Sequence, residues 1–231
     1  EISEPDGLLE DPAWSALLQR GSSRLADTKT EINGVNIALE AIRHYAGLKD
    51  GLFIKRHPIS EEEFLSTGTA ERAKAVSREI GEQLQTLTRL QSEENRLTAR
   101  QASLLPWQAM DMPLELSGTE HVLFKIGYLP AGVDVGQIQV SFGDLAAELL
   151  EISSDKQQKY CLLICHRQDE ESVMECLRPF SFSAVSFQGL TGTADANLTS
   201  VSQALAENRK GQEDAAAAIA ANGEARDALR V

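Results

Sequence analysis

The sequence is poor in aromatic residues and in positive charge. Only 5% of its 231 residues are aromatic, and 22 Lys and Arg stand against 35 Asp and Glu, which gives a formal net charge of −13. Because phosphate backbones and anionic membrane surfaces bind clustered Lys and Arg, this balance argues against a nucleic-acid-binding protein and against a membrane-surface protein. A basic protein partner is compatible with the charge.

Long apolar runs and disulfide frameworks are also missing. No run approaches the roughly 18 apolar residues of a membrane span, and no signal peptide is visible. The three cysteines, Cys161, Cys165 and Cys176, are an odd and sparse set, which makes a poor disulfide framework. Two of them lie in the apolar run Tyr160–Cys165, which we interpret as a buried strand. These features favour a reducing, cytosolic setting.

Motifs for phosphate, metal or nucleophilic chemistry do not occur. The sequence contains no GxxxxGK[ST] and no GxGxxG. Gly189–Gly192 precedes a helix but has no lysine, so we interpret it as a plain turn rather than as an anion site. Cys165 and His166 are adjacent, and neighbours along a strand point to opposite faces, so we interpret the cysteines as buried thiols rather than metal ligands. The acidic runs fall at helix starts or on solvated faces. We therefore predict no enzymatic activity, no cofactor and no metal.

Heptad patterns predict long amphipathic helices in three segments. Segment 14–46 has a seam of Trp14, Leu18, Gly21, Leu25, Thr28, Ile32, Val35, Leu39, Ile42 and Ala46. Segment 69–104 has a seam of Ala73, Val76, Ile80, Leu87, Leu90, Glu94, Leu97, Gln101 and Leu104. Segment 193–231 has a seam of Leu198, Val201, Leu205, Asn208, Gln212, Ala215, Ile219 and Asn222. Polar seam residues lower stability but can fix the register of paired helices.

A mixed α/β module is predicted between the second and third helical segments. Its strands are expected at His121–Tyr128, Leu150–Ser153, Lys159–His166 and Phe182–Phe187, and its helices are expected to start at Ser141–Asp144 and Asp169–Glu171. The order β-α-β-β-α-β indicates a ferredoxin-like lobe. We expect Leu162, Ile164, Phe124 and Ile126 to form its buried face with Val185, and Trp107 to seat a helix end on the sheet.

The predicted fold is therefore α+β, with a ferredoxin-like βαββαβ lobe on a long antiparallel coiled coil or helical bundle. Residues 1–104 would carry the outgoing helices with an interrupting loop at 47–68, residues 105–190 the lobe, and residues 191–231 the returning helix. We expect 69–104 to pack antiparallel against 193–231. Helix 14–46 either folds back beside 69–104 or runs on from it in line, and the sequence leaves that choice open.

Five stretches carry a family resemblance when taken in order along the chain. They are Gly51–Phe64 (GLFIKRHPISEEEF), Leu105–Leu116 (LPWQAMDMPLEL), Ser117–Thr119, Gly127–Pro130 (GYLP) and the heptad segment after Gly189–Thr193. In this order they resemble the cytoplasmic N-terminal part of subunit I, which is subunit a in eukaryotes, of the V/A-type ATPases and ATP synthases.

The resemblance implies a non-catalytic stator component, an arm that links the membrane ion-channel subunit to the peripheral stalks during proton or sodium transport. The implied partners are the peripheral-stalk E and G subunits, and the implied location is the cytoplasmic side of the membrane within a membrane-bound complex. We expect a fragment that holds the distal lobe with its helices, without the membrane half. The ion-path arginine of the family lies in that half, so no catalytic residue carries over.

We expect partner contacts at an edge of the lobe and at a basic loop. Edge strands offer unpaired backbone groups, and loops carry binding surfaces. The candidate residues are Pro130, Asp134, Glu151 and Ser153 in the lobe and Lys55, Arg56 and His57 in the interrupting loop. An alternative function, a coiled-coil adaptor with a ferredoxin-like ligand-sensing domain, stays open.

Overall fold

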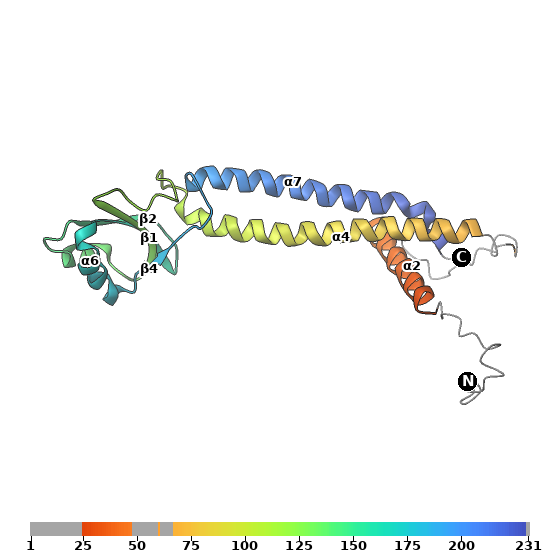
Figure 1. The fold of residues 1–231 in the computed structure, drawn as a ribbon, viewed down its shortest axis with the longest axis horizontal. Coiled ribbons are helices and arrows are strands. Elements are labelled where there is room, and N and C mark those ends of the chain that lie inside the picture. Colours follow the sequence, from red (N-terminus) through yellow and green to blue (C-terminus); the bar gives the residue numbers. More distant parts are fainter. Residues whose placement is uncertain (1–24, 48–59, 61–66, 230–231) are drawn as a thin grey trace, which may run out of the picture. The chain divides into compact units, whose positions relative to one another are not determined.

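The structure, a computed structural model, describes residues 25–47, 60 and 67–229 and divides into two compact units. One unit comprises the described residues of 1–86 and 215–231, and the other, the sheet unit, comprises residues 87–214. The sheet unit contains a four-stranded antiparallel sheet as well as helices, so the predicted α+β class is confirmed (Figure 1). None of the helices in the described part of the chain is long and apolar enough to cross a membrane.

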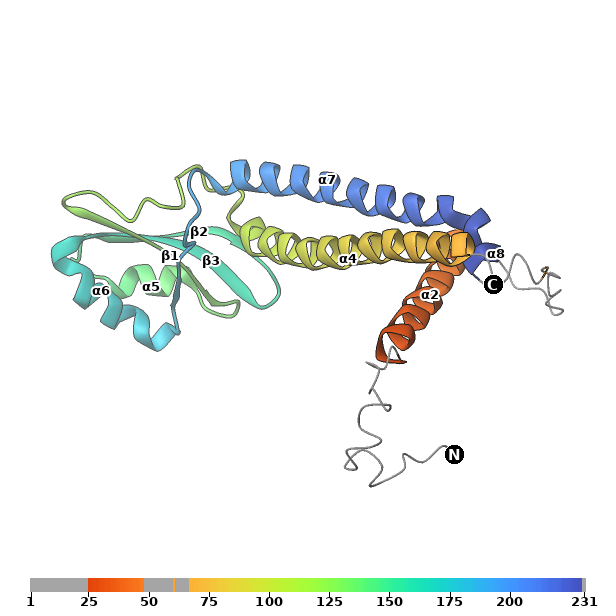
Figure 2. The same cartoon turned by 45° about the vertical axis from the view of Figure 1, so that its right-hand side comes forward.

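The sheet unit runs in the order β-α-β-β-α-β. Its elements are β1 (Val122–Pro130), α5 (Val135–Ser141), β2 (Ala147–Ser154), β3 (Gln158–His166), α6 (Glu170–Leu177) and β4 (Ser183–Val185), with 3₁₀ turns at Arg167–Asp169 and Arg178–Phe180. The strands lie in the order β2-β3-β1-β4, and every neighbouring pair is antiparallel. Helices α5 and α6 cover one face of this sheet (Figure 2).

Two long helices flank the lobe along the chain, α4 (Thr67–Leu104) before it and α7 (Ala194–Ala221) after it. Within the sheet unit they pack antiparallel, as predicted: Leu97 shares a buried cluster with Leu205, and Asn208 Nδ2 donates to the Leu90 carbonyl oxygen at 3.0 Å. The predicted α7 seam is buried or half-buried at Leu198, Val201, Leu205, Asn208, Gln212, Ala215, Ile219 and Asn222. Heptad periodicity therefore identified the packed face of α7 correctly.

Helix α7 stops earlier than the heptad pattern indicated. It ends at Ala221, and a 3₁₀ turn (Asn222–Ala225) and the short helix α8 (Arg226–Leu229) follow. The prediction of one unbroken helix to the end of the chain is therefore wrong. Gly223 lies in this turn, and glycine weakens a helix because it loses more backbone freedom than other residues when it is fixed.

In the other unit, helix α2 (Leu25–Tyr45) packs only the second half of the predicted seam, where Val35 and Leu39 are half-buried and Ile42 is buried. Its buried residues are Ala38, Ala41 and Ile42. Leu25 and Ile32, two predicted seam residues, are 60% and 56% exposed, so that half of the predicted seam is wrong. A Cβ atom at Gly34 would lie 3.2 Å from Ser77 Oγ of α4. Gly34 therefore lies close to the Ser77 side chain, and a larger residue at this position would push the two helices apart.

The position of α2 distinguishes the two arrangements that the sequence allowed, beside α4 or in line with it. The Lys74 ammonium of α4 pairs with the Glu31 carboxylate of α2 at 3.1 Å. Helix α2 also contacts α8 and the 3₁₀ turn before it. Within its unit, α2 therefore packs beside α4 instead of continuing it in line.

The helix predicted to begin at Ser141 does not form. Helix α5 ends there, and Ser141 Oγ donates to the Ile138 carbonyl oxygen at 2.7 Å instead of capping a new helix. Gly143 adopts φ 56°, a left-handed conformation that turns the chain. The following residues pair with β3 as strand β2, and this pairing buries Leu149. Long-range pairing with the apolar β3 strand overrides the local capping pattern.

Both faces of the sheet are covered. Under α5 and α6 lie Leu123, Leu129, Leu149, Cys161, Leu163 and Cys165. The opposite face holds the residues predicted to be buried: Ile126 and Leu162 are buried, and Phe124, Ile164 and Val185 are half-buried. The prediction is thus confirmed for two residues, and the more deeply buried face is the one under the two short helices.

Candidate partner-binding surface

Trp107 joins the helical pair to the sheet. It lies in a 3₁₀ turn (Leu105–Trp107) that directly follows α4, and it is only 2% exposed. Its ring meets Tyr160 edge-on at 5.5 Å and Phe187 at 6.2 Å between ring centroids. The same buried cluster holds Leu104, Ala194 and Leu198 of the helices and Ile126 and Leu162 of the sheet. The predicted role of Trp107, seating a helix end on the sheet, is confirmed.

Glu151 and Ser153 lie on β2, which is an edge strand as predicted. The exposed Glu151 carboxylate pairs with Lys159 Nζ at 3.3 Å. Ser153 Oγ donates to the Pro106 carbonyl oxygen at 2.6 Å, so this hydroxyl ties the strand to the turn that carries Trp107. The β2–β3 register shifts between these two residues, and such irregularities blunt an edge against indiscriminate pairing.

Gln139 of α5 covers part of the same edge, and sequence reasoning did not find it. Its amide nitrogen donates to the Ala147 carbonyl oxygen at 3.0 Å, and its amide oxygen accepts from the Leu149 N–H at 3.1 Å. The side chain thus mimics one residue of an adjoining strand. The edge that a partner could still reach is therefore shorter than the strand, and it centres on Glu151.

Pro130 and Asp134 bound the loop between β1 and α5. Pro130 is exposed at the end of β1, and its carbonyl oxygen accepts from the Val133 N–H at 3.0 Å. The Asp134 carboxylate accepts from the Gly136 N–H at 2.9 Å as the N-cap of α5. Such a cap stabilises a helix by about 1 kcal/mol. Asp134 thus has a structural role whether or not it contacts a partner.

The turn between β2 and β3 adjoins this loop. The Ala131 N–H donates to the Gln157 carbonyl oxygen at 2.8 Å. The Asp155 carboxylate accepts from the backbone N–H groups of Gln157 and Gln158 and from the Tyr160 hydroxyl. These bonds, led by the Gln157 N–H, hold the pKa of Asp155 below its usual value. A fixed negative charge therefore lies at this end of the sheet.

The structure brings three of the seven predicted contact residues together at one end of the sheet. Pro130 lies opposite Gln158 of β3, and Ser153 lies opposite Tyr160, so both flank the start of the same central strand. Glu151 lies opposite Cys161, one residue further along β3. We call this end of the lobe, with Pro130, Glu151, Ser153 and the Asp155 turn, the β2–β3 end. Of the other candidates, Asp134 is the N-cap of α5, and Lys55, Arg56 and His57 lie outside the described residues.

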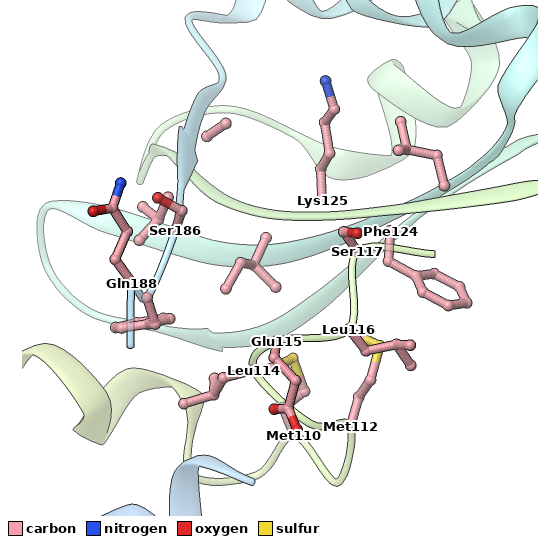
Figure 3. Close-up of a pocket in the computed structure, with 15 residues that line it drawn as sticks. Met110, Met112, Leu114, Glu115, Leu116, Ser117, Phe124, Lys125, Ser186 and Gln188 are labelled. Carbon is pink, nitrogen blue, oxygen red and sulfur yellow. The ribbon is translucent and has the colours of Figure 1, made fainter. Parts of the chain in front are cut away.

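A cavity of about 420 Å³ opens beside β1, and no sequence pattern predicted it. Strand β4 pairs with β1 only at residues 126–128, whereas the Phe124 N–H donates to the Ser117 carbonyl oxygen at 2.9 Å. An opening is left between these two covering segments at Lys125. Figure 3 shows the labelled walls, which include Met110, Met112, Leu114, Leu116, Phe124, Ser186 and Gln188.

The cysteines are not arranged for chemistry. All three are free thiols, and Cys161 and Cys165 are buried under α5 and α6. Burial, with a smaller effect of the Glu151 carboxylate, raises the pKa of Cys161 to about 11. A thiol so far from its thiolate form is a poor nucleophile. Within the described ranges, no group of three or more His, Cys, Asp and Glu side chains could hold a metal ion.

Comparison with known proteins finds similarity among solved structures. No protein-family model matches the chain, and no curated protein matches it. Among solved structures, the chain is similar to the cytoplasmic N-terminal domain of subunit I, homolog of subunit a, of V-ATPase. The match has 16% sequence identity and a TM-score of 0.46 and covers 91% of this chain and 70% of that chain. That domain belongs to the family that the sequence motifs resemble. Because the identity and the TM-score are low, the function proposed below rests on the chain's own residues.

Proposed function

We propose that the chain is part of a non-catalytic stator component of a rotary V/A-type ATPase. In this role it is a cytoplasmic arm that links the membrane ion-channel subunit to the peripheral stalks during proton or sodium transport. The ordered sequence motifs support the family. The strand order β2-β3-β1-β4, with one helix after β1 and one after β3, supports a ferredoxin-like lobe.

The joint at Trp107 is the observation that carries the mechanical part of the proposal. Both helices of the antiparallel pair end in one buried cluster with the sheet, through Leu104 and Trp107 on one side and Ala194 and Leu198 on the other. The Leu114 N–H donates to the Gly192 carbonyl oxygen at 2.9 Å, which ties together the two connections. A stator resists torque, and a close-packed joint transmits force with little compression.

The β2–β3 end is the proposed contact for the peripheral-stalk E and G subunits. The part of the β2 edge that Gln139 leaves uncovered lies there, beside the fixed charge of Asp155 and the carboxylate of Glu151. In a chain with net charge −13, these groups favour a basic partner face. Charge attraction of this kind acts mainly on the association rate and weakens with salt.

The test is binding of an isolated stalk E–G heterodimer to the 231-residue chain at two salt concentrations. We expect Glu151→Lys to lower affinity about tenfold at low salt and to flatten the salt dependence, since a rim charge changes association most. Glu213→Lys makes the same charge change at an exposed position of α7 and serves as the control. Charge reversal at Lys55 and Arg56 tests the second candidate surface separately.

Three results bear on different parts of this proposal. If the wild-type chain binds and Glu151→Lys behaves like the control, the β2–β3 end is not the contact. If only the Lys55 and Arg56 variants weaken binding, the basic loop is the contact. If the wild-type chain does not bind the heterodimer at all, the stalk link is wrong for this part of the protein. Several apolar spans encoded after residue 231 would support the family independently.

The cavity beside β1 favours a second candidate, a coiled-coil adaptor with a ligand-sensing lobe. Its volume, about 420 Å³, is within the range of small-molecule sites. Its two charged wall residues are already engaged: Glu115 accepts from the Gly192 N–H, and Lys125 pairs with Glu170 at 2.6 Å. The class of ligand that fits is therefore small, neutral and apolar. A screen of such compounds by thermal shift tests this candidate, and Met112→Trp, which fills the cavity, serves as its control.

A further inference from the structure

A polar layer interrupts the apolar seam between α4 and α7 within the sheet unit. Its members are Glu94 of α4 and Asn208 and Gln212 of α7, with Arg209 at its outer edge. On the side toward the lobe, the seam is apolar at Leu97, Val201 and Leu205. Polar groups inside a helix pair lower its stability, so their presence requires a physical account.

Every polar atom that is buried in the layer has a partner. The Asn208 side chain is 6% exposed, and its amide nitrogen donates to the Leu90 carbonyl oxygen at 3.0 Å. Gln212 Nε2 donates to Glu94 Oε2 at 2.8 Å and to Asn208 Oδ1 at 2.8 Å. The Leu90 carbonyl and the side chains of Glu94, Asn208 and Gln212 therefore form one connected network across the two helices. A satisfied network of this kind gives directional contacts that leucines cannot give.

The charge of Glu94 belongs to the same network. Its carboxylate accepts from Gln212 and, at 3.2 Å, from Arg209 Nε, and these two bonds, with Gln212 first, hold the pKa of Glu94 below its usual value. The carboxylate is thus held charged beside the seam, and its donors, Arg209 and Gln212, lie within one turn of α7. Leu90 also packs closely here, since a Cβ at Gly211 would lie 3.2 Å from Leu90 Cδ1.

We infer that the layer of Glu94, Asn208 and Gln212 fixes the register of the two helices and rejects the neighbouring registers. A slip by one heptad shifts the helices by roughly 10 Å. The heptad equivalents of Gln212 are Leu205 and Ile219, and those of Asn208 are Val201 and Ala215. A slip in either direction therefore puts Leu205 or Ile219 in the place of Gln212, which is the donor to the Glu94 carboxylate inside the seam. The apolar positions alone reject such slips less well, because Leu and Val recur at the same spacing.

The size of the penalty follows from the groups that lose their partners. Leaving one buried polar group without a partner costs the equivalent of roughly a tenfold change in an equilibrium constant, and more for a charged group. In either slip, the Glu94 carboxylate and the Gln212 amide no longer bond to each other. Without the layer, we therefore expect the slipped population to rise at least about tenfold. This inference concerns the helix pair itself and does not depend on the proposed function.

The test is disulfide trapping in the full 231-residue chain with Cys176→Ser. Gln101 Nε2 donates to Ser202 Oγ at 3.4 Å, so cysteines at positions 101 and 202 report the native register. Cysteines at 101 and 195, or at 101 and 209, report slips of one heptad. With the layer intact, we expect only the 101–202 crosslink. In the variant Glu94→Leu, Asn208→Leu, Gln212→Leu, we expect a slipped crosslink to appear while the melting temperature is kept or raised.

The joint at Trp107 could hold the register by itself, so each experiment is repeated with Trp107→Ala. In that background, we expect the intact layer still to give only the native crosslink. Slipped crosslinks with the layer intact, or none without it in both backgrounds, overturn the inference. Arg209→Ala is the matched control, because it removes only the 67% exposed partner of Glu94 and should leave the native crosslink alone. If the triple variant does not fold, Asn208→Leu makes the same test.

Discussion

Replacing Trp107 with alanine is the most direct test of the joint between the helices and the sheet. The side chain is 2% exposed and meets two aromatic rings edge-on, Tyr160 and Phe187. Truncation of a buried aromatic residue to alanine costs about 3–5 kcal/mol. The two edge-on contacts account for roughly 1–3 kcal/mol of that, at about 0.5–1.5 kcal/mol each. We expect a loss in the upper half of the range, because the ring fills the space between two packed layers.

Urea unfolding followed by circular dichroism measures this loss. The slope of the free energy against urea concentration checks that each variant unfolds in the same manner as the wild type. Leu105→Ala is a matched control in the same 3₁₀ turn, because Leu105 is 58% exposed. Its expected effect is within about 0.5 kcal/mol of zero. Hydrogen exchange at β1 amides localises the effect of Trp107→Ala to the sheet unit.

The reasoning fails if Trp107→Ala costs no more than Leu105→Ala. In that case the ring does not bear on folding, and the helices are not held to the sheet at this point. If Trp107→Ala lowers the free energy of unfolding strongly but the β1 amides exchange no faster, the Trp107 side chain is buried but does not hold the helices to the sheet. Trp107→Phe is expected to fall between the two variants, since it keeps an aromatic ring but loses volume.

Three further predictions concern the sheet, the thiols and catalysis. Leu162→Ala and Leu163→Ala, on opposite faces of β3, should each lower the free energy of unfolding by about 2–5 kcal/mol in urea titrations, whereas Leu150→Ala at the 37% exposed position should cost far less; a loss below about 0.5 kcal/mol at Leu162 would mean that the strand is misplaced. The pKa of Cys161, raised by burial from 9.0 to about 11, should make alkylation of this thiol at pH 8 much slower than that of the half-buried Cys176. Because the protonated thiol is the form favoured by folding, its contribution to stability is complete below pH 9 and is lost as the pH rises toward 11. No ATPase or hydrolase activity should accompany the chain through stringent purification, and turnover that co-elutes with it would contradict the non-enzymatic reading.

Sequence periodicity predicted the buried face correctly in the elements whose apolar pattern coincides with their packed face. The seam of α7 is buried as predicted because a single neighbouring helix follows it, and the apolar alternation of β1 and β3 matches their paired register. The same reasoning failed for the first half of α2, where Leu25 and Ile32 are exposed, although the seam residue Ile42 is buried beside Ala38 and Ala41. A heptad repeat marks the face of a helix that can pack against a second helix lying alongside it. It does not tell which face is used when two helices approach closely at a glycine such as Gly34.

The candidate partner-binding surface was likewise predictable from the sequence only in part. The edge position of β2 and its Glu151 followed from the order of elements and from a short acidic strand between apolar ones. The covering of that edge by Gln139, and the tie from Ser153 to the Pro106 carbonyl, involve residues 8 to 47 positions apart in the chain. No local pattern encodes such contacts, because a glutamine on a short helix is usually solvated.

The sequence by itself determined the long helices, the apolar strands and the lack of a GxxxxGK[ST] or GxGxxG motif, since periodicity, composition and motifs are local properties of the chain. The tertiary structure decided which faces pack, where the β2 edge stays reachable, and that a cavity opens beside β1. It also decided that Glu94, Asn208 and Gln212 meet as one network. Polar seam residues can be read in a sequence, but whether their donors and acceptors find one another depends on the register of two helices that are joined through the whole lobe.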